Sequence, residues 1–228
     1  MKLRLEDKTK AIKLRIQGRT YREIRTAIPN LSKSTLSGWL KNFRLTPGQK
    51  AKLEQNIYKI GCDARMKAGW TKRQIKQKKI ESIFMKSTSE YQELADNRLF
   101  LTGLVLYWGE GNKKTEMFQF TNSDPQAISV MMKWLIEICQ IPKEKIKIRL
   151  YIHTIYAHEN CEEFWSKVVK IPTDKFSKTI YKPTIHRKKK NPAYKGCVQL
   201  RVLKTDFYWK VMGWLRAITK DNILYKRP

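Results

Sequence analysis

Apolar residues recur at helical spacing near the beginning of the chain and predict three short amphipathic helices. The helical periods cover residues 8–17, 20–28 and 33–42, and each presents one apolar face. Thr20 and Ser32 stand where N-cap residues of the second and third helices are expected. Three short helices with a tight turn before the third are typical of a helix-turn-helix unit.

A long helical pattern follows, from residue 46 to about residue 96. Thr46 supplies a capping hydroxyl and Pro47 a first-turn proline, while Gly69 is a candidate break. Residues 72–79 form a basic stripe, which fits either a solvated helix face or a surface that follows phosphates. We interpret this segment as a helical connector.

The most apolar stretch, residues 99–111, predicts a helix that is buried on most of its sides. Gly103 and Glu110 lie seven residues apart, two helical turns, and therefore share one face. Such a glycine lets another helix approach closely, and Glu110 places a carboxylate at the last turn. Two interpretations stay open: a functional acid, or a solvated carboxylate on a helix that ends with Gly111 in the left-handed conformation.

Strands and helices alternate in the remainder of the chain and predict an α+β domain with a mostly antiparallel sheet. Helices are expected at 125–138, 159–169 and 205–219, and strands at 115–121, 145–153, 178–185 and 197–204. The last two strands are expected to form a hairpin. In the second strand one face carries only Ile and Leu, and the other carries Lys147, Arg149, Tyr151 and His153.

The charge of the chain indicates a polyanion as its partner. Its 228 residues include 48 Lys and Arg against 20 Asp and Glu, a formal net charge of +28. Binding to nucleic acid offsets self-repulsion on this scale. No apolar stretch reaches the length of a membrane-spanning helix, and the first residues lack the apolar core of a signal peptide. We therefore expect a cytoplasmic protein without a membrane partner.

The four cysteines are scattered, with no Cys-x-x-Cys pair, and are expected to be reduced thiols. His153, His158 and Cys161 are close in sequence, and they leave a zinc site open as a remote alternative. No fourth ligand stands at a matching spacing.

A basic segment, residues 186–196, joins the last two predicted strands. Its charges are clustered at Arg187, Lys188, Lys189 and Lys190. The segment is either a solvated loop or a contact along a phosphate backbone. We favour nucleic-acid contact because Lys182 and Arg201 make the adjoining strands basic too, and the pattern leaves RNA open beside DNA.

The stretch from Gly18 to Ile24, followed by residues 32–41, resembles the helix-turn-helix of resolvases, transposases and many repressors. The resemblance implies that the third helix lies in the major groove of DNA. It places six residues at or near phosphates and base edges: Ser32, Lys33, Ser34, Thr35, Ser37 and Lys41. The alternative is a three-helix bundle that binds protein, which the surrounding basic residues disfavour.

The second half of the chain resembles the LAGLIDADG homing-endonuclease fold, in which a buried helix ending in an acid precedes a sheet with a basic face. The matching residues are 100–104, 109–111 and 120–124. In that family two such helices pack through small residues, and each places one acid at a shared centre where metal ions meet the scissile phosphates. The resemblance implies that Glu110 is the catalytic Mg²⁺ ligand. We place Lys113 and Lys114 close to phosphate only because they follow Glu110 closely in the sequence.

These observations predict three regions: a helix-turn-helix domain over 1–45, a basic helical connector over 46–96 and a LAGLIDADG-like domain over 97–228. The single copy of the motif implies a homodimer through the helix at 97–111. The main hypothesis is a Mg²⁺-dependent endonuclease that cuts double-stranded DNA. The alternative is a sequence-specific DNA-binding regulator with a degenerate endonuclease fold. A resolvase-like or transposase-like accessory protein, whose second domain serves assembly, is the third.

Overall fold

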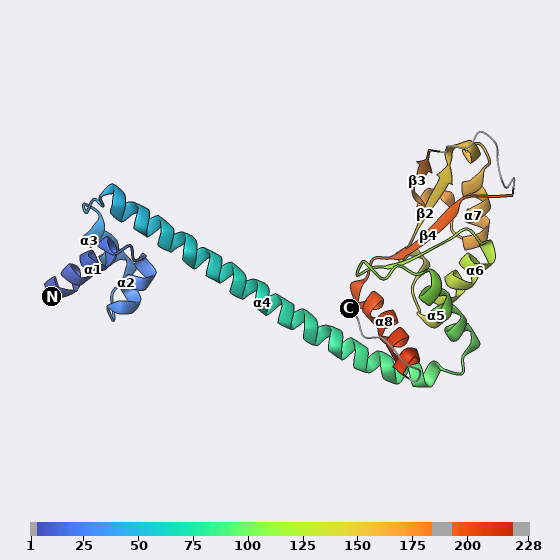
Figure 1. Ribbon diagram of the computed structural model, residues 1–228, viewed down its shortest axis with the longest axis horizontal. Coiled ribbons are helices and arrows are strands. Elements are labelled where there is room, and N and C mark those ends of the chain that lie inside the picture. The colour runs from blue at the N-terminus through green and yellow to red at the C-terminus, as the bar shows by residue number, and fades with distance from the viewer. Residues whose placement is uncertain (1–3, 184–192, 221–228) are drawn as a thin grey trace. The chain divides into compact units, whose positions relative to one another are not determined.

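The computed structural model describes residues 4–183 and 193–220 (Figure 1). The chain divides into two compact units, residues 1–76 and 77–228. The long helix α4, Pro47–Leu94, contributes its first turns to the first unit and its last turns to the second. It is unbroken at Gly69, so that candidate break is not realised.

Three short helices form the first unit together with the start of α4, as the sequence pattern predicts. They are α1 (Leu5–Ile16), α2 (Tyr21–Ala27) and α3 (Lys33–Leu40). Their small core is made of Ala11, Ile24, Ile28, Leu31, Leu36 and Leu40. The predicted N-caps are confirmed, because the side chain of Thr20 accepts from the Glu23 N–H in a capping box and Ser32 accepts from the Thr35 N–H.

The start of α4 is attached to the turn between α1 and α2. The Asn56 side-chain amide donates to the Gly18 carbonyl oxygen at 2.9 Å and to the Glu23 carboxylate at 2.7 Å. Gly18 has φ +82°, and a Cβ there would lie 3.0 Å from the Lys52 backbone. The turn therefore needs glycine for its left-handed conformation and for the close approach of α4.

The second unit is an α+β fold with a four-stranded, mostly antiparallel sheet in the order β1-β4-β2-β3. Its strands are β1 (Phe118–Asn122), β2 (Ile146–His153), β3 (Ser177–Lys182) and β4 (Cys197–Val202). Its helices after α4 are α5 (Arg98–Glu110), α6 (Pro125–Lys133), α7 (Cys161–Val169) and α8 (Thr205–Lys220). A π-helix, η1 (Trp134–Ile138), continues α6, and three 3₁₀ turns lie at Lys143–Lys145, Thr154–Tyr156 and Thr173–Lys175.

The predicted hairpin between the last two strands is wrong. β3 and β4 lie on opposite sides of β2, and β3 pairs with β2 in parallel while β4 pairs with β2 and β1 antiparallel. The burial of the two strands explains this order. β3 is exposed along most of its length and occupies the edge, whereas every second residue of β4 is buried. The helix α7 provides the crossover that a parallel pair requires.

The core of the second unit lies between one face of the sheet and the helices. Its buried side chains come from β1, β2 and β4 and from α5, α6, α7 and α8. Trp134, Trp165 and Trp214 are among its largest fully buried side chains.

The central contact of this core joins Gly103 of α5 to Trp134 at the start of η1. A Cβ at Gly103 would lie 2.2 Å from two ring atoms of the Trp134 indole. The indole N–H donates to the Phe100 carbonyl oxygen at 3.1 Å, and the ring also packs against Phe118 and Trp214. The close helix approach expected at Gly103 is therefore made by the chain's own α6–η1 helix.

Adding a methyl group at Gly103 should destabilise the second unit. We expect Gly103→Ala to lower the free energy of unfolding by about 1–3 kcal/mol, because the methyl group overlaps the Trp134 ring. Gly109→Ala is the matched control on the same helix, since a Cβ there meets nothing within 4 Å. It should leave stability unchanged or raise it by up to about 1 kcal/mol. Equal effects of the two substitutions in urea unfolding would contradict this packing.

Candidate nucleic-acid interface

The first candidate surface is the exposed side of α3. The six residues expected near DNA are all exposed: Ser32, Lys33, Ser34, Thr35, Ser37 and Lys41. Leu36 and Leu40 are buried and hold the opposite side of α3 in the core. A Cβ at Gly38 would meet nothing within 4 Å, so no part of the described chain covers this side of the helix there.

Two of these residues also have structural roles at the N-terminus of α3. The Ser32 hydroxyl accepts from the Thr35 N–H at 3.0 Å and lies 2.8 Å from the hydroxyls of both Ser34 and Thr35. The cap therefore uses part of the hydrogen-bonding capacity of Ser32 and Thr35. Lys33 and Ser37 carry the polar groups that the cap leaves available on this surface.

The stretch of sequence that contains α3 has no acidic residue. Between Glu23 and Glu54 the chain has no Asp or Glu, while Lys33, Lys41 and Arg44 lie in this interval. A basic segment without internal counter-charges attracts an external polyanion such as a phosphate backbone.

The second candidate surface is the side of the sheet opposite the core, which we call the outer face. The cross-strand registers place twelve side chains on it: Gln119, Thr121, Lys147, Arg149, Tyr151, His153, Ser177, Ile180, Lys182, Cys197, Gln199 and Arg201. The alternation predicted for 145–153 is confirmed, since Ile146, Ile148, Leu150 and Ile152 are buried. The five basic or aromatic residues predicted on this sheet, Lys147, Arg149, Tyr151, Lys182 and Arg201, are thus brought together.

Three cations cluster at the centre of the outer face. Arg201 stands directly opposite Lys147, and Arg149 occupies the next position along β2 on the same side. The Arg201 guanidinium donates to the Ser177 hydroxyl at 3.5 Å, so it extends across β2 toward the edge strand. Like charges placed opposite one another destabilise a sheet unless an anion lies between them.

The cations of the outer face have no carboxylate partner within the sheet. None of the four strands contains Asp or Glu. Within residues 4–183 and 193–220, no ion pair involves Lys147, Arg149 or Arg201. The Nε atoms of Arg149 and Arg201 are buried without a hydrogen-bond acceptor in this part of the chain. These two donors are therefore unsatisfied within the described part of the chain.

Among the twelve described residues of the outer face, Tyr151 is the one Tyr, Phe or Trp, and it is already engaged on its ring and its hydroxyl. The Lys182 ammonium lies 5.1 Å from the ring centroid, and the hydroxyl donates to the Gln199 side-chain oxygen at 3.2 Å. Proteins that bind single strands stack bases on free aromatic rings. The outer face offers phosphate-binding groups and no such platform.

The acid expected to be functional, Glu110, is exposed at the end of α5. Gly111 has φ −73° and ψ 144°, an extended conformation, so the left-handed cap considered for it is wrong. Lys113 caps the helix instead, because its ammonium donates to the carbonyl oxygens of Trp108 at 2.5 Å and Gly111 at 3.0 Å. Desolvation lowers the pKa of Lys113, and the charge of Glu110 acts in the opposite direction. Lys114 is exposed.

The exposed side of α5 differs from the side that carries Gly103. Thr102, Val105 and Gly109 are exposed, with Val105 at 51%. A second copy packing along α5 would contact these residues, since Gly103 is covered by Trp134. Glu110 follows Gly109 and is therefore about 100° around the helix, at the rim of such a contact rather than its centre.

The described residues contain no ready metal site. Within residues 4–183 and 193–220, no group of three His, Cys, Asp or Glu side chains is placed to hold a metal ion, which also removes support for zinc at His153, His158 and Cys161. All four cysteines are free, as expected. The basic cluster Arg187, Lys188, Lys189 and Lys190 lies outside the described residues. No described helix combines the length and apolarity needed to span a membrane.

Some members of the outer face are not evident from the sequence. Ser177 joins Arg149 only through the parallel pairing of β2 and β3, which the sequence pattern did not predict. Gln119 and Thr121 join the same face because β1 pairs with β4. The alternation of these residues with the buried Phe118 and Phe120 indicates which side of β1 they occupy. It does not indicate which strand pairs with β1.

Searches against protein-family models, curated proteins and solved structures found no match to this chain.

The hydrogen bonds to Glu23 in the first unit make its stability depend on pH. Burial would raise the pKa of Glu23, but donation from the Thr20 backbone, Arg19, the Thr20 hydroxyl and Asn56 lowers it from 4.5 to about 2. A pKa that is lower in the folded state stabilises the fold above the unfolded value, and this contribution is lost as the pH falls. We expect the first unit to lose stability between pH 4.5 and about 2, measured by the urea midpoint of its core amide NMR signals.

The substitution Glu23→Gln should flatten this pH dependence. Glu54→Gln is the matched control, because Glu54 is exposed on α4 and its ion pair with Lys50 is long, at 3.9 Å. Both variants falling equally with pH would show that Glu23 is not the responsible group.

Proposed function

We propose that the protein binds double-stranded DNA, with α3 in the major groove and the outer face of the sheet along the phosphate backbone. The observation that carries the proposal is the cluster of Lys147, Arg149 and Arg201, which has no carboxylate on any of the four strands. The repulsion among these clustered cations is offset when a polyanion binds to them, and the regularly spaced phosphates of DNA are such a polyanion.

The helix-turn-helix resemblance supports a sequence-reading role for α3. Its exposed side combines the hydroxyl of Ser37 with the cations Lys33 and Lys41. Hydroxyls reach base edges or phosphates, and lysines reach phosphates or guanine. A helix that presents both kinds of group beside the open backbone at Gly38 is suited to a groove rather than to a flat protein surface.

The outer face supports a duplex rather than a single strand as ligand. Its one tyrosine ring is covered by Lys182, so bases have no free aromatic surface to stack upon. Its remaining polar groups, among them Gln199 and Ser177, are hydrogen-bond donors and acceptors of the type that bind phosphates and sugars. The two surfaces therefore have separable roles: α3 for sequence and the sheet for backbone affinity.

DNA cleavage within a LAGLIDADG-like fold is the second candidate function. The observation in its favour is the exposed position of Glu110 at the end of the central helix of the second unit. The described residues do not fit a Mg²⁺ site, because Glu110 belongs to no group of three metal-ligating side chains among them and the cation Lys113 is a charged neighbour. Another copy of the chain would have to bring further carboxylates, through a homodimer along α5. The non-catalytic regulator is therefore the better supported of the two functions.

Both surfaces should contribute to DNA affinity in different ways. With duplexes selected from a randomised library, we expect affinity to fall steeply with salt in fluorescence anisotropy. Arg201→Gln should weaken binding to all duplexes and reduce the slope of log affinity against log salt by about one. Lys33→Ala should weaken binding, and Ser37→Ala should change the preferred sequence.

Matched controls separate these effects from general loss of charge. Lys133→Gln removes an exposed charge on α6, and Lys10→Ala removes one on α1, both away from the proposed surfaces. Each control should bind as the wild type does. Controls that weaken binding as much as Arg201→Gln and Lys33→Ala would reduce the interaction to net charge, and a flat salt response would contradict the proposal.

The cleavage question is decided with the same selected duplexes in the presence of Mg²⁺. We expect them to remain intact at wild-type concentrations that saturate binding, because within the described residues Glu110 belongs to no group of three metal-ligating side chains. Glu110→Gln should bind DNA with unchanged affinity, since Glu110 is exposed and lies on neither surface. Cutting by the wild type that disappears in Glu110→Gln would instead establish the endonuclease.

A further inference from the structure

A groove of about 730 Å³ lies in the first unit between α2 and the first half of α4, and we call it the α2–α4 groove. Its walls come from α1, the turn before α2, α2 itself and α4. No residue of α3 is among its lining residues. The groove is therefore separate from the surface that is expected in the major groove of DNA.

Apolar side chains are exposed in the α2–α4 groove. Ile57 and Ile60 lie about one helical turn apart on α4, and they are 52% and 39% exposed. Ala27 of α2 is exposed as well, and Leu14 of α1 is half-buried. Exposed apolar residues that gather in a groove mark a surface on which a partner docks.

The α2–α4 groove combines these apolar residues with one available cation. Arg19 pairs with Glu23 at 2.9 Å, and Glu23 also accepts from the Thr20 N–H and the Asn56 amide. Arg22 is exposed, and it forms no ion pair within residues 4–183 and 193–220. Its guanidinium is therefore available to a carboxylate of a partner.

The walls of the groove favour a helical occupant. The middle turns of α2 and α4 satisfy their backbone groups by hydrogen bonds inside each helix, so they offer none to an extended peptide. A helix satisfies its own backbone groups and presents apolar residues at i, i+3, i+4 and i+7 on one side. Small ligands are disfavoured, because Ile57 and Ile60 stay widely exposed whereas ligand pockets enclose most of the ligand surface.

Charge selects among the macromolecules that could fill the groove. A second copy of this chain would bring the same net charge of +28, and the two copies would repel one another. A DNA backbone would pair with Arg22 but would gain nothing from the apolar side chains of Ile57 and Ile60. An acidic amphipathic helix matches both features of the groove.

We propose that the α2–α4 groove docks an acidic amphipathic helix of a partner protein. The apolar side of that helix covers Ile57, Ile60 and Ala27, and a carboxylate at the border of this side pairs with Arg22. The inference does not rest on the DNA-binding proposal, because no residue of α3 lines the groove.

The probe is a display library of helical peptides of roughly 16 residues, about four turns, presented to the full chain without DNA. Outward positions are Glu or Asp, and positions i, i+3, i+4 and i+7 vary among Leu, Ile, Met, Phe and Trp. We expect enriched peptides to bind one site per chain with a Kd below about 100 μM in fluorescence anisotropy. Peptides of the same composition in scrambled order keep the charge but lose the apolar side, so they should bind at least about tenfold more weakly.

Substitutions locate the binding site. Ile57→Gln and Arg22→Gln change exposed side chains and keep a good helix former, so both variants should fold. We expect Ile57→Gln to weaken binding of the enriched peptides about tenfold and Arg22→Gln about fivefold. Ile75→Gln and Arg73→Gln are the matched controls, at exposed positions of α4 outside the groove, and should bind these peptides as the wild type does.

The controls also separate a docked helix from attraction by net charge. The proposal is overturned if no peptide of the library is enriched, if scrambled peptides bind equally well, or if the control variants weaken binding as much as the groove variants do. It is overturned as well if Arg22→Gln weakens binding of duplex DNA and leaves peptide binding unchanged, because the groove would then belong to the phosphate backbone.

Discussion

The insertion of the Trp134 indole at Gly103 is the contact on which the second unit depends. The ring occupies the space that a side chain at residue 103 would fill, and its N–H satisfies the Phe100 carbonyl oxygen. It also packs against Phe118 of β1 and Trp214 of α8. One side chain therefore joins α5, the sheet and the last helix. The most apolar helix of the chain, α5, is partly buried by neighbouring elements of the same chain. A central helix used in this way needs no second copy to cover Gly103.

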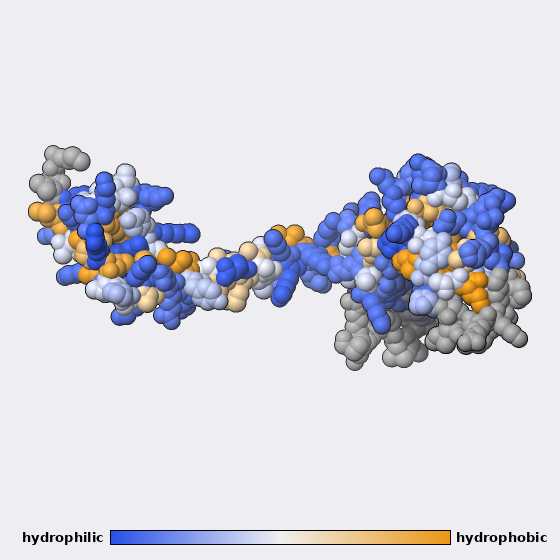
Figure 2. All heavy atoms as spheres, turned by 90° about the horizontal axis from the view of Figure 1, so that it is seen from above, coloured by the Kyte–Doolittle hydropathy of each residue, from blue (hydrophilic) through white to orange (hydrophobic). Residues whose placement is uncertain are grey.

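This core fixes the character of the opposite side of the sheet. Because the helices pack against one face only, the strand residues that alternate with the core must point outward. In β2 and β4 these outward positions are Lys147, Arg149 and Arg201, so the alternation that builds the core also gathers the cations. In the view of Figure 2, hydrophilic residues cover most of the visible described surface of each unit, and hydrophobic ones lie in scattered places.

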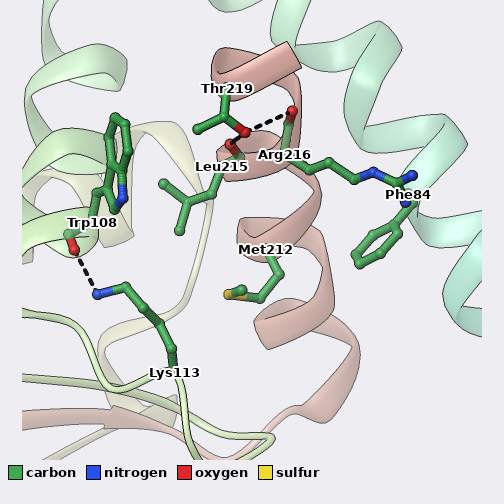
Figure 3. Close-up of a pocket in the computed structure, with 7 residues that line it drawn as sticks. All are labelled: Phe84, Trp108, Lys113, Met212, Leu215, Arg216 and Thr219. Carbon is green, nitrogen blue, oxygen red and sulfur yellow. Dashed lines mark hydrogen bonds between the residues drawn. The ribbon is translucent and has the colours of Figure 1, made fainter. Parts of the chain in front are cut away.

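Local signals in the sequence predicted most helices and strands. They did not predict the features that depend on pairing between distant segments. The caps at Thr20 and Ser32, the helix containing Gly103 and the alternating strand at 145–153 all follow from periodicity and capping chemistry within a few residues. Strand order does not follow from such local signals, because it depends on how deeply each strand is buried once the sheet has assembled. Ser177 reached the outer face through such a pairing. A cavity lined in part by Trp108 and Arg216 could not be predicted from the sequence for the same reason (Figure 3). Its lining comes from three helices and a connecting segment that are far apart in the chain.

The distribution of the acids explains why the positive charge matters where it does. Several acidic side chains form contacts within the protein: Glu23 caps α2 and binds Asn56 of α4, Asp206 pairs with Lys79, and Glu159 pairs with Lys195 at 2.7 Å. No such acid occurs on α3 or on any strand. The uncompensated charge is therefore not spread evenly but includes one helix face and one sheet face, both built on rigid cores. Cations fixed on such cores stay close to one another, which raises the local positive potential at these two surfaces.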